Sequence, residues 1–109
     1  MEQSPYKLMR DLEAAIARVL AGVDSASLDP GPAKTVRLLK GQLVDARLDV
    51  RDYELAETRA EQGRLAADGK KRLAAVRQSL LKAAEQDIFS AVQVAQFSAQ
   101  LDRLAAFIA

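Results

Sequence analysis

Apolar side chains recur every three or four residues along most of this chain, the spacing that places them on one face of an α-helix. In the first segment they are Leu8, Leu12, Ala15, Ile16 and Val19. The Ser4 hydroxyl can accept a hydrogen bond from a free amide at the start of a helix. Pro5 suits the first helical turn, because an amide there would have no partner within the helix. Gly22 suits the left-handed residue that closes many helices. The pattern predicts a first helix over residues 5–22.

The next segment, residues 24–32 (DSASLDPGP), contains residue types that compete with helical hydrogen bonding or cannot continue a helix, and predicts a loop. Residues 33–86 contain no proline, and their composition favours helix strongly. Asp68 and Gly69 are the candidate turn in this stretch. However, strong helix formers flank them, and Asp68 pairs favourably with Arg72 only in a continuous helix. We therefore predict one long helix over 33–86, with a break at this Asp-Gly pair as the alternative.

The long helix would carry apolar residues on two opposite faces. One face holds Val36, Leu39, Leu43, Ala46, Val50 and Tyr53. The other holds Val44, Leu48, Leu55, Ala66, Leu73 and Leu80. Residues 57–64 (ETRAEQGR) are polar except for Ala60, so this part either bridges through solvent or is the place where a hairpin bends. An unbroken helix would span about 80 Å, which is longer than a compact domain of this size. Such a long helix with two apolar faces predicts that a second chain packs against it.

The last helix has the clearest start in the chain. Ser90 and Gln93 have the spacing of a capping box, and Phe89 and Val94 have that of a hydrophobic staple. The pattern predicts a helix over 90–108. Its main apolar face holds Val94, Phe97, Leu101, Leu104 and Ile108. A second face of smaller residues holds Val92, Ala95, Ala99 and Ala106. Either face suits a packed core or a contact with a partner.

Together these elements predict an all-α fold with three main helices in a single helical domain over 1–109, arranged as an elongated helical bundle or coiled coil. Because the first helix covers only one face of the long helix, we predict a homodimer. The predicted partner-binding residues are Leu48, Leu55, Leu73, Leu80, Phe97, Leu101, Leu104 and Ile108. The expected function is that of a non-enzymatic scaffold, adaptor or regulatory subunit that self-associates and binds another protein through its helix faces.

The composition argues against an enzyme. The chain has no His and no Cys, which removes the commonest general base and the commonest ligands of transition metals. Asp45, Asp49 and Asp52 share a helix face, but Arg47 and Arg51 alternate with them, and this pattern is typical of a solvated helix surface. We therefore expect no catalytic residue, no metal and no cofactor.

Basic and acidic side chains nearly balance, 16 against 15, so binding to nucleic acid requires a local patch. The densest basic stretch is 64–82, in which Lys70, Lys71 and Arg72 are the candidate phosphate contacts. No aromatic residues interleave with it to stack on bases, so a small nucleic-acid-associated protein is the alternative function and not the favoured one. No segment has the length and apolarity of a membrane span, and the Ala- and Arg-rich usage favours a bacterial cytoplasmic protein.

Overall fold

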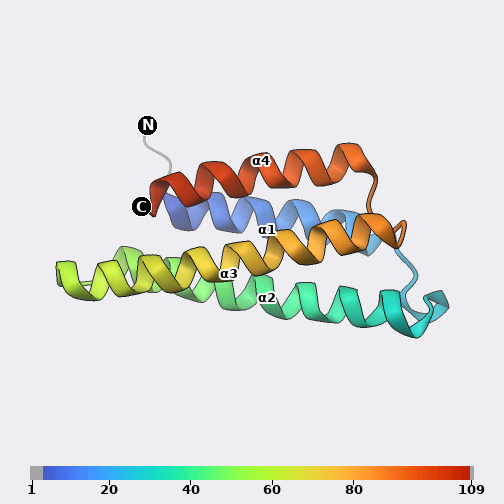
Figure 1. The fold of residues 1–109 in the computed structure, drawn as a ribbon, viewed down its shortest axis with the longest axis horizontal. Helices are drawn as coiled ribbons and strands as arrows, with labels where there is room; N and C mark the ends of the chain where they lie inside the picture. The colour runs from blue at the N-terminus through green and yellow to red at the C-terminus, as the bar shows by residue number, and fades with distance from the viewer. Residues whose placement is uncertain (1–3, 109) are drawn as a thin grey trace.

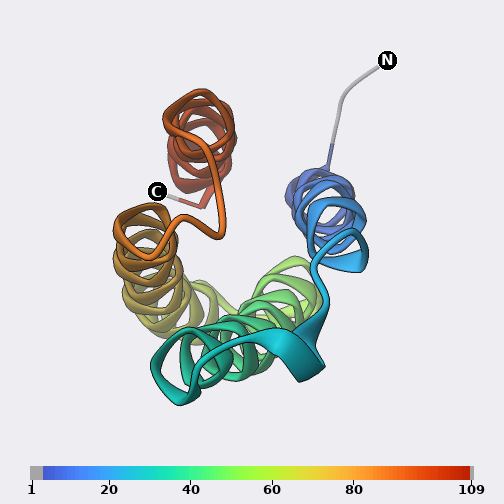
Figure 2. The same cartoon turned by 90° about the vertical axis from the view of Figure 1, so that its right-hand side faces the viewer.

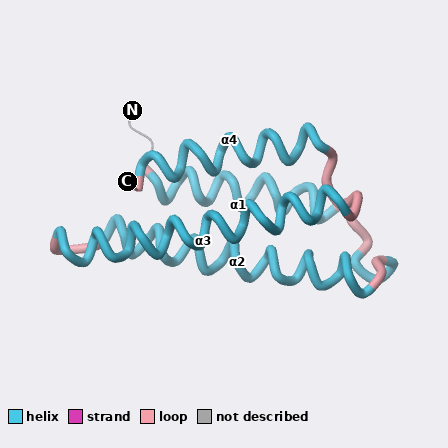
Figure 3. The backbone as a smooth tube through the Cα atoms, in the orientation of Figure 1, coloured by secondary structure: helices cyan, strands magenta, loops and turns pink. Residues whose placement is uncertain are grey.

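The computed structural model describes residues 4–108, which form four α-helices and one short 3-10 helix. These are α1 (Pro5–Ala21), η1 (Ser25–Ser27), α2 (Pro30–Leu55), α3 (Arg59–Glu85) and α4 (Ala91–Phe107). Successive helices run in opposite directions (Figure 1), and the loops lie at the two ends of the molecule (Figure 3). Seen from one end, the helices surround a common interior, and α1 packs against both α2 and α4 (Figure 2). The chain is thus an all-α four-helix bundle.

The predicted first and last helices are confirmed, although Gly22 ends α1 in a right-handed conformation (φ −82°, ψ −4°) and not in the expected left-handed one. Their N-terminal caps show why they begin where they do. The Ser4 hydroxyl accepts a hydrogen bond from the Lys7 amide at 3.1 Å, with Pro5 in the first turn. At α4, the Ser90 hydroxyl accepts from the Gln93 amide at 3.1 Å, and the Gln93 side chain accepts from the Ser90 amide at 2.9 Å. Both amides would otherwise lack a partner within the helix. Phe89, just before this capping box, is buried.

The single long helix predicted over 33–86 is wrong, because the stretch folds into two helices. The first of them, α2, ends at Leu55, and Ala56 is extended with φ −60° and ψ 132°. Thr58 then caps α3, its hydroxyl accepting from the Glu61 amide at 3.1 Å. The break therefore falls at the start of the polar 57–64 segment, where a hairpin bend was the alternative. It does not fall at the Asp-Gly pair, which lies within α3.

The hairpin explains how one chain covers most of the apolar residues on the two faces of the 33–86 stretch. A straight helix would point Leu73 and Leu80 away from Leu43 and Val50. Folding α3 back along α2 turns both sets toward the same interior, where each of these four residues is buried. Burial of apolar side chains is the dominant favourable term in folding, so the chain bends where the polar segment has least apolar surface to lose.

Close packing between α3 and the end of α4 depends on a glycine. Gly69 is buried, and a Cβ atom at this position would lie 3.2 Å from Cδ1 of Ile108. The absence of a side chain lets Ile108 reach the core, where it is 1% exposed. At the other end of α4, the rings of Phe89 and Phe97 pack edge to face with centroids 5.7 Å apart. Gly69 therefore serves helix packing here, not a turn.

The bundle is short compared with the predicted rod. Its principal extents are 47 × 27 × 18 Å, whereas a continuous helix over 33–86 would be about 80 Å long. Within residues 4–108, no helix is both long and apolar enough to span a membrane.

Candidate interaction surface

The structure places most of the predicted partner-binding residues inside the chain's own core. Six of the eight are at most 5% exposed: Leu73, Leu80, Phe97, Leu101, Leu104 and Ile108. The other two lie on α2 and reach solvent, Leu48 with 38% and Leu55 with 70% of its surface exposed. Of the eight predicted partner-binding residues, only Leu48 and Leu55 are therefore accessible to a partner while the bundle is closed.

A surface groove lies between α1 and α2, and small side chains create it. Ala14, Ala17 and Ala21 recur along the outer side of α1, and they are too short to fill the space beside α2. Opposite them lies Val44 of α2, which is 40% exposed. The groove has a volume of about 590 Å³, and the buried side chains of Leu20 and Leu43 complete its floor. We call it the α1/α2 groove.

Charged side chains from both helices surround this apolar floor. Arg10 and Glu13 come from α1, and Lys40 and Arg47 come from α2. Glu13 and Arg47 bind each other across the groove, with Oε1 of Glu13 2.9 Å from Nη1 of Arg47. The guanidinium of Arg10 lies over the ring of Tyr6, with Cζ 5.9 Å from the ring centroid. The groove therefore combines an apolar floor with more positive than negative charge at its rim.

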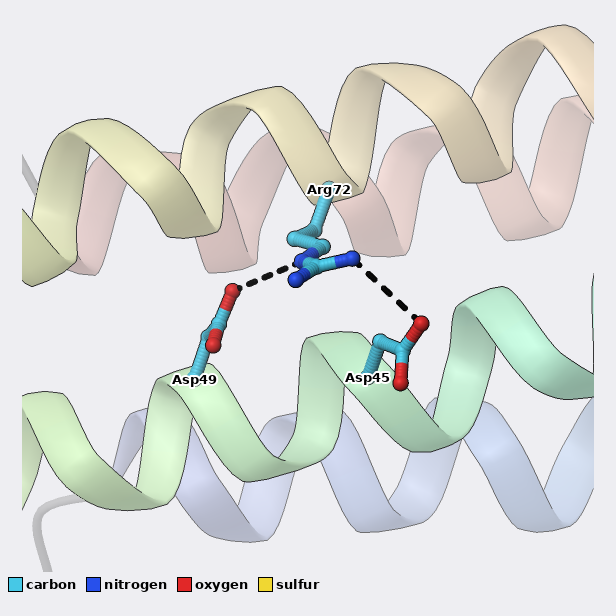
Figure 4. Close-up of polar contacts among 3 residues, drawn as sticks. All are labelled: Asp45, Asp49 and Arg72. Atoms are coloured by element: carbon cyan, nitrogen blue, oxygen red, sulfur yellow. Dashed lines mark hydrogen bonds and ion pairs between the residues drawn. The ribbon is translucent and has the colours of Figure 1, made fainter.

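The three aspartates of α2 do not form a metal site with one another. Nε of Arg72 on α3 lies 3.0 Å from Oδ2 of Asp49, and its Nη1 lies 3.3 Å from Oδ2 of Asp45 (Figure 4). The hydrogen bond to Asp49, together with the negative charges around it, raises the pKa of Arg72 above its ordinary value. Asp52 pairs separately with Arg51. Across residues 4–108, no three acidic, His or Cys side chains gather where they could hold a metal ion.

The candidate phosphate contacts differ in whether they already bind an acidic side chain. Lys70 and Lys71 are exposed on α3, but Arg72 is bound to two aspartates of α2, and Arg77 is bound to Asp102 of α4. The shallow depression beside Lys71 and Arg72 also includes the carboxylate-bearing Asp68 in its lining. These acids offset much of the positive charge that the basic stretch shows in the sequence alone.

Comparison of the chain with protein-family models, curated proteins and solved structures gives no match. Any functional assignment therefore depends on the chain's own geometry. The α1/α2 groove is not among the features predicted from the sequence, although one signal is present there: Ala14, Ala17 and Ala21 repeat at steps of three and four on a single helix face. A single sequence does not reveal that Val44 lies across the groove from these alanines.

Proposed function

We propose that this protein is a non-enzymatic interaction module that binds another protein by taking a helix of that protein into the α1/α2 groove. The observation that carries the proposal is the groove itself, in which an apolar floor of Ala14, Ala17 and Val44 stays open to solvent between two helices. A groove of this kind, with charged residues at its rim, is the usual acceptor of an amphipathic helix.

The dimensions of the floor support a helix as the ligand. Ala14 and Ala21 are seven residues apart on α1, which corresponds to about 10 Å or two helical turns. Small side chains allow a third helix to approach at the normal interaxial distance of about 8–10 Å. Leu48 lies one turn beyond Val44 on α2 and is partly exposed, so it offers additional apolar contact next to the groove.

The alternative, binding of nucleic acid, has weaker support. Two cations of the 64–82 stretch, Arg72 and Arg77, already bind aspartates on neighbouring helices. A phosphate backbone would have to compete with these carboxylates for the guanidinium groups. The groove requires no such exchange, because its floor is already open.

Self-association remains a prediction. It was based on apolar faces that a single chain seemed unable to cover, and the hairpin of α2 and α3 covers most of them. Of the apolar residues on those two faces, Val44, Leu48 and Leu55 remain exposed. A homodimer would therefore form through this small set, which is less apolar surface than the sequence suggested.

The proposed function can be tested by blocking the groove without disturbing the fold. Ala17 is exposed in the middle of α1, and Ala17→Gln keeps a good helix former while placing a bulky side chain over the floor. Ala67→Gln is the matched control, since Ala67 is exposed within α3 and does not line the groove. Immobilised proteins would be exposed to a lysate of the organism that encodes the chain. We expect proteins that bind the unmodified chain and Ala67→Gln but not Ala17→Gln.

A folded Ala17→Gln variant that captures the same proteins as the control would show that the groove is not the docking site. Far-UV circular dichroism and thermal unfolding of all three proteins confirm that the comparison is between folded molecules.

A further inference from the structure

We infer that the helix taken by the α1/α2 groove is acidic along the edges of its apolar face. The inference depends on the proposed function and specifies the chemistry of the partner. It follows from the distribution of charge around the groove.

Positive charge at the groove rim exceeds negative charge, and the two walls share it. Of the four charged lining residues, Glu13 and Arg47 neutralise each other through their 2.9 Å contact. Arg10 remains on the α1 wall, and Lys40 remains on the α2 wall. Within residues 4–108, neither of these two forms a salt bridge. A ligand between the walls therefore meets an uncompensated cation on each side.

The contact between Arg10 and Tyr6 positions the cation without cancelling its charge. A ring face attracts a guanidinium through its quadrupole and contributes no negative charge. In the smaller depression that continues past Arg10, Lys7 and Asp11 form their own pair at 3.7 Å. This neighbouring pair therefore adds no net charge to the excess at the groove rim.

Two arginines elsewhere on the bundle are compensated by acids of neighbouring helices, whereas Arg10 at the groove forms no salt bridge within residues 4–108. Arg72 binds Asp45 and Asp49, and Arg77 binds Asp102. The whole chain has a net charge of only +1. The preference for acid at the groove is thus a local complementarity, which orients a partner and speeds its association, and not an overall attraction of a basic protein for polyanions.

A second copy of the chain fits this groove less well than an acidic helix does. In a symmetric pair the same patch faces itself, which would bring Arg10 and Lys40 of one protomer near those of the other. An acidic helix can place apolar residues over Ala17 and Val44 while its flanking carboxylates reach the two cations. Such pairs lose part of their water on docking, which strengthens charge-assisted hydrogen bonds.

The experiment is a selection from displayed helical peptides that share one fixed apolar face and carry Glu, Gln or Lys at random in the flanking positions. The full-length chain is the bait, in parallel with Ala17→Gln to block the groove and Lys40→Glu to reverse one rim charge. We expect Glu to be enriched over Lys at the flanks by about fivefold or more for the unmodified chain at low salt. For Lys40→Glu, we expect that enrichment to fall or reverse at the positions facing α2.

The possible results separate the inference from the proposed function. Peptides that require an open groove but show no flank preference, or prefer Lys, would overturn the acidic partner while leaving helix docking intact. Absence of any peptide whose binding is lost in Ala17→Gln would overturn helix docking itself, and the acidic partner with it. For selected acidic peptides, raising salt from about 50 to 300 mM is expected to weaken binding about threefold to tenfold, because the rim charges are solvent-exposed.

Discussion

The cap at Thr58 offers a test of the hairpin in which the two candidate folds predict opposite signs. In the structure, Thr58 is outside α3 with φ −124° and ψ 156°, and its hydroxyl accepts from the Glu61 amide at 3.1 Å. Thr58→Ala removes that acceptor, and loss of an N-cap costs about 1 kcal/mol of the free energy of unfolding. For a chain of 109 residues, this corresponds to a decrease in Tm of about 4 °C.

In a continuous helix over 33–86, the same substitution would act in the interior. There Ala is favoured over Thr by about 0.6 kcal/mol, so Thr58→Ala would raise Tm by about 2–3 °C. Thr58→Ser is the control, because it keeps the hydroxyl and is expected to leave Tm within about 1 °C of the unmodified protein. Thermal unfolding followed by far-UV circular dichroism measures all three. A more stable Thr58→Ala variant would refute the assignment of a helix start at residue 59.

The remaining predictions concern the core, a helix glycine and the oligomeric state. Leu80→Ala is expected to lower the free energy of unfolding, measured in urea, by about 2–5 kcal/mol because Leu80 is fully buried. Leu55→Ala should change it by no more than about 0.5 kcal/mol because Leu55 is 70% exposed. Similar losses for the two variants would contradict the packing. Gly63→Ala should add about 1 kcal/mol to the free energy of unfolding, since a Cβ there meets nothing within 4 Å. Gly69→Ala should add less, because its Cβ would crowd a core side chain. A larger gain from Gly69→Ala than from Gly63→Ala would contradict the assignment of Gly69 to the core. The predicted homodimer requires a solution mass near twice 11.8 kDa, reduced to the monomer value in a folded Leu48→Lys, Leu55→Lys double variant; a mass of 11.8 kDa for the unmodified chain would rule the dimer out.

Some of the helix ends could be predicted from the sequence. Ser4 and Ser90 act through neighbours three residues away, so their roles follow from local spacing. Thr58 and Glu61 have the same spacing, and the Thr-x-x-Glu pattern was available as a signal for the hairpin. The strong helix propensity on either side points instead to a continuous helix. Propensity is a weak guide at such a point, because tertiary packing readily overrides it.

The candidate site was less accessible to sequence reasoning than the helices were. Leu73 and Leu80 were correctly identified as apolar and helical, yet nothing in one sequence says whether the partner for such a face is another segment or another chain. The groove is formed by Ala17 on one helix and Val44 on another, and its rim charge depends on which cations find acids elsewhere. Arg72 and Arg77 belong to the densest basic stretch in the chain, but contacts with α2 and α4 compensate them.

Sequence alone determined the helical class, the apolar face of each helix and the caps at Ser4 and Ser90, because these depend on residues within one or two turns of each other. Tertiary structure decided the bend after Leu55, the burial of residues predicted to bind partners, and the placement of uncompensated charge beside the α1/α2 groove. These features depend on which helix faces meet across the bundle. That outcome is set by how much apolar surface the whole chain can remove from water, and local spacing does not record it.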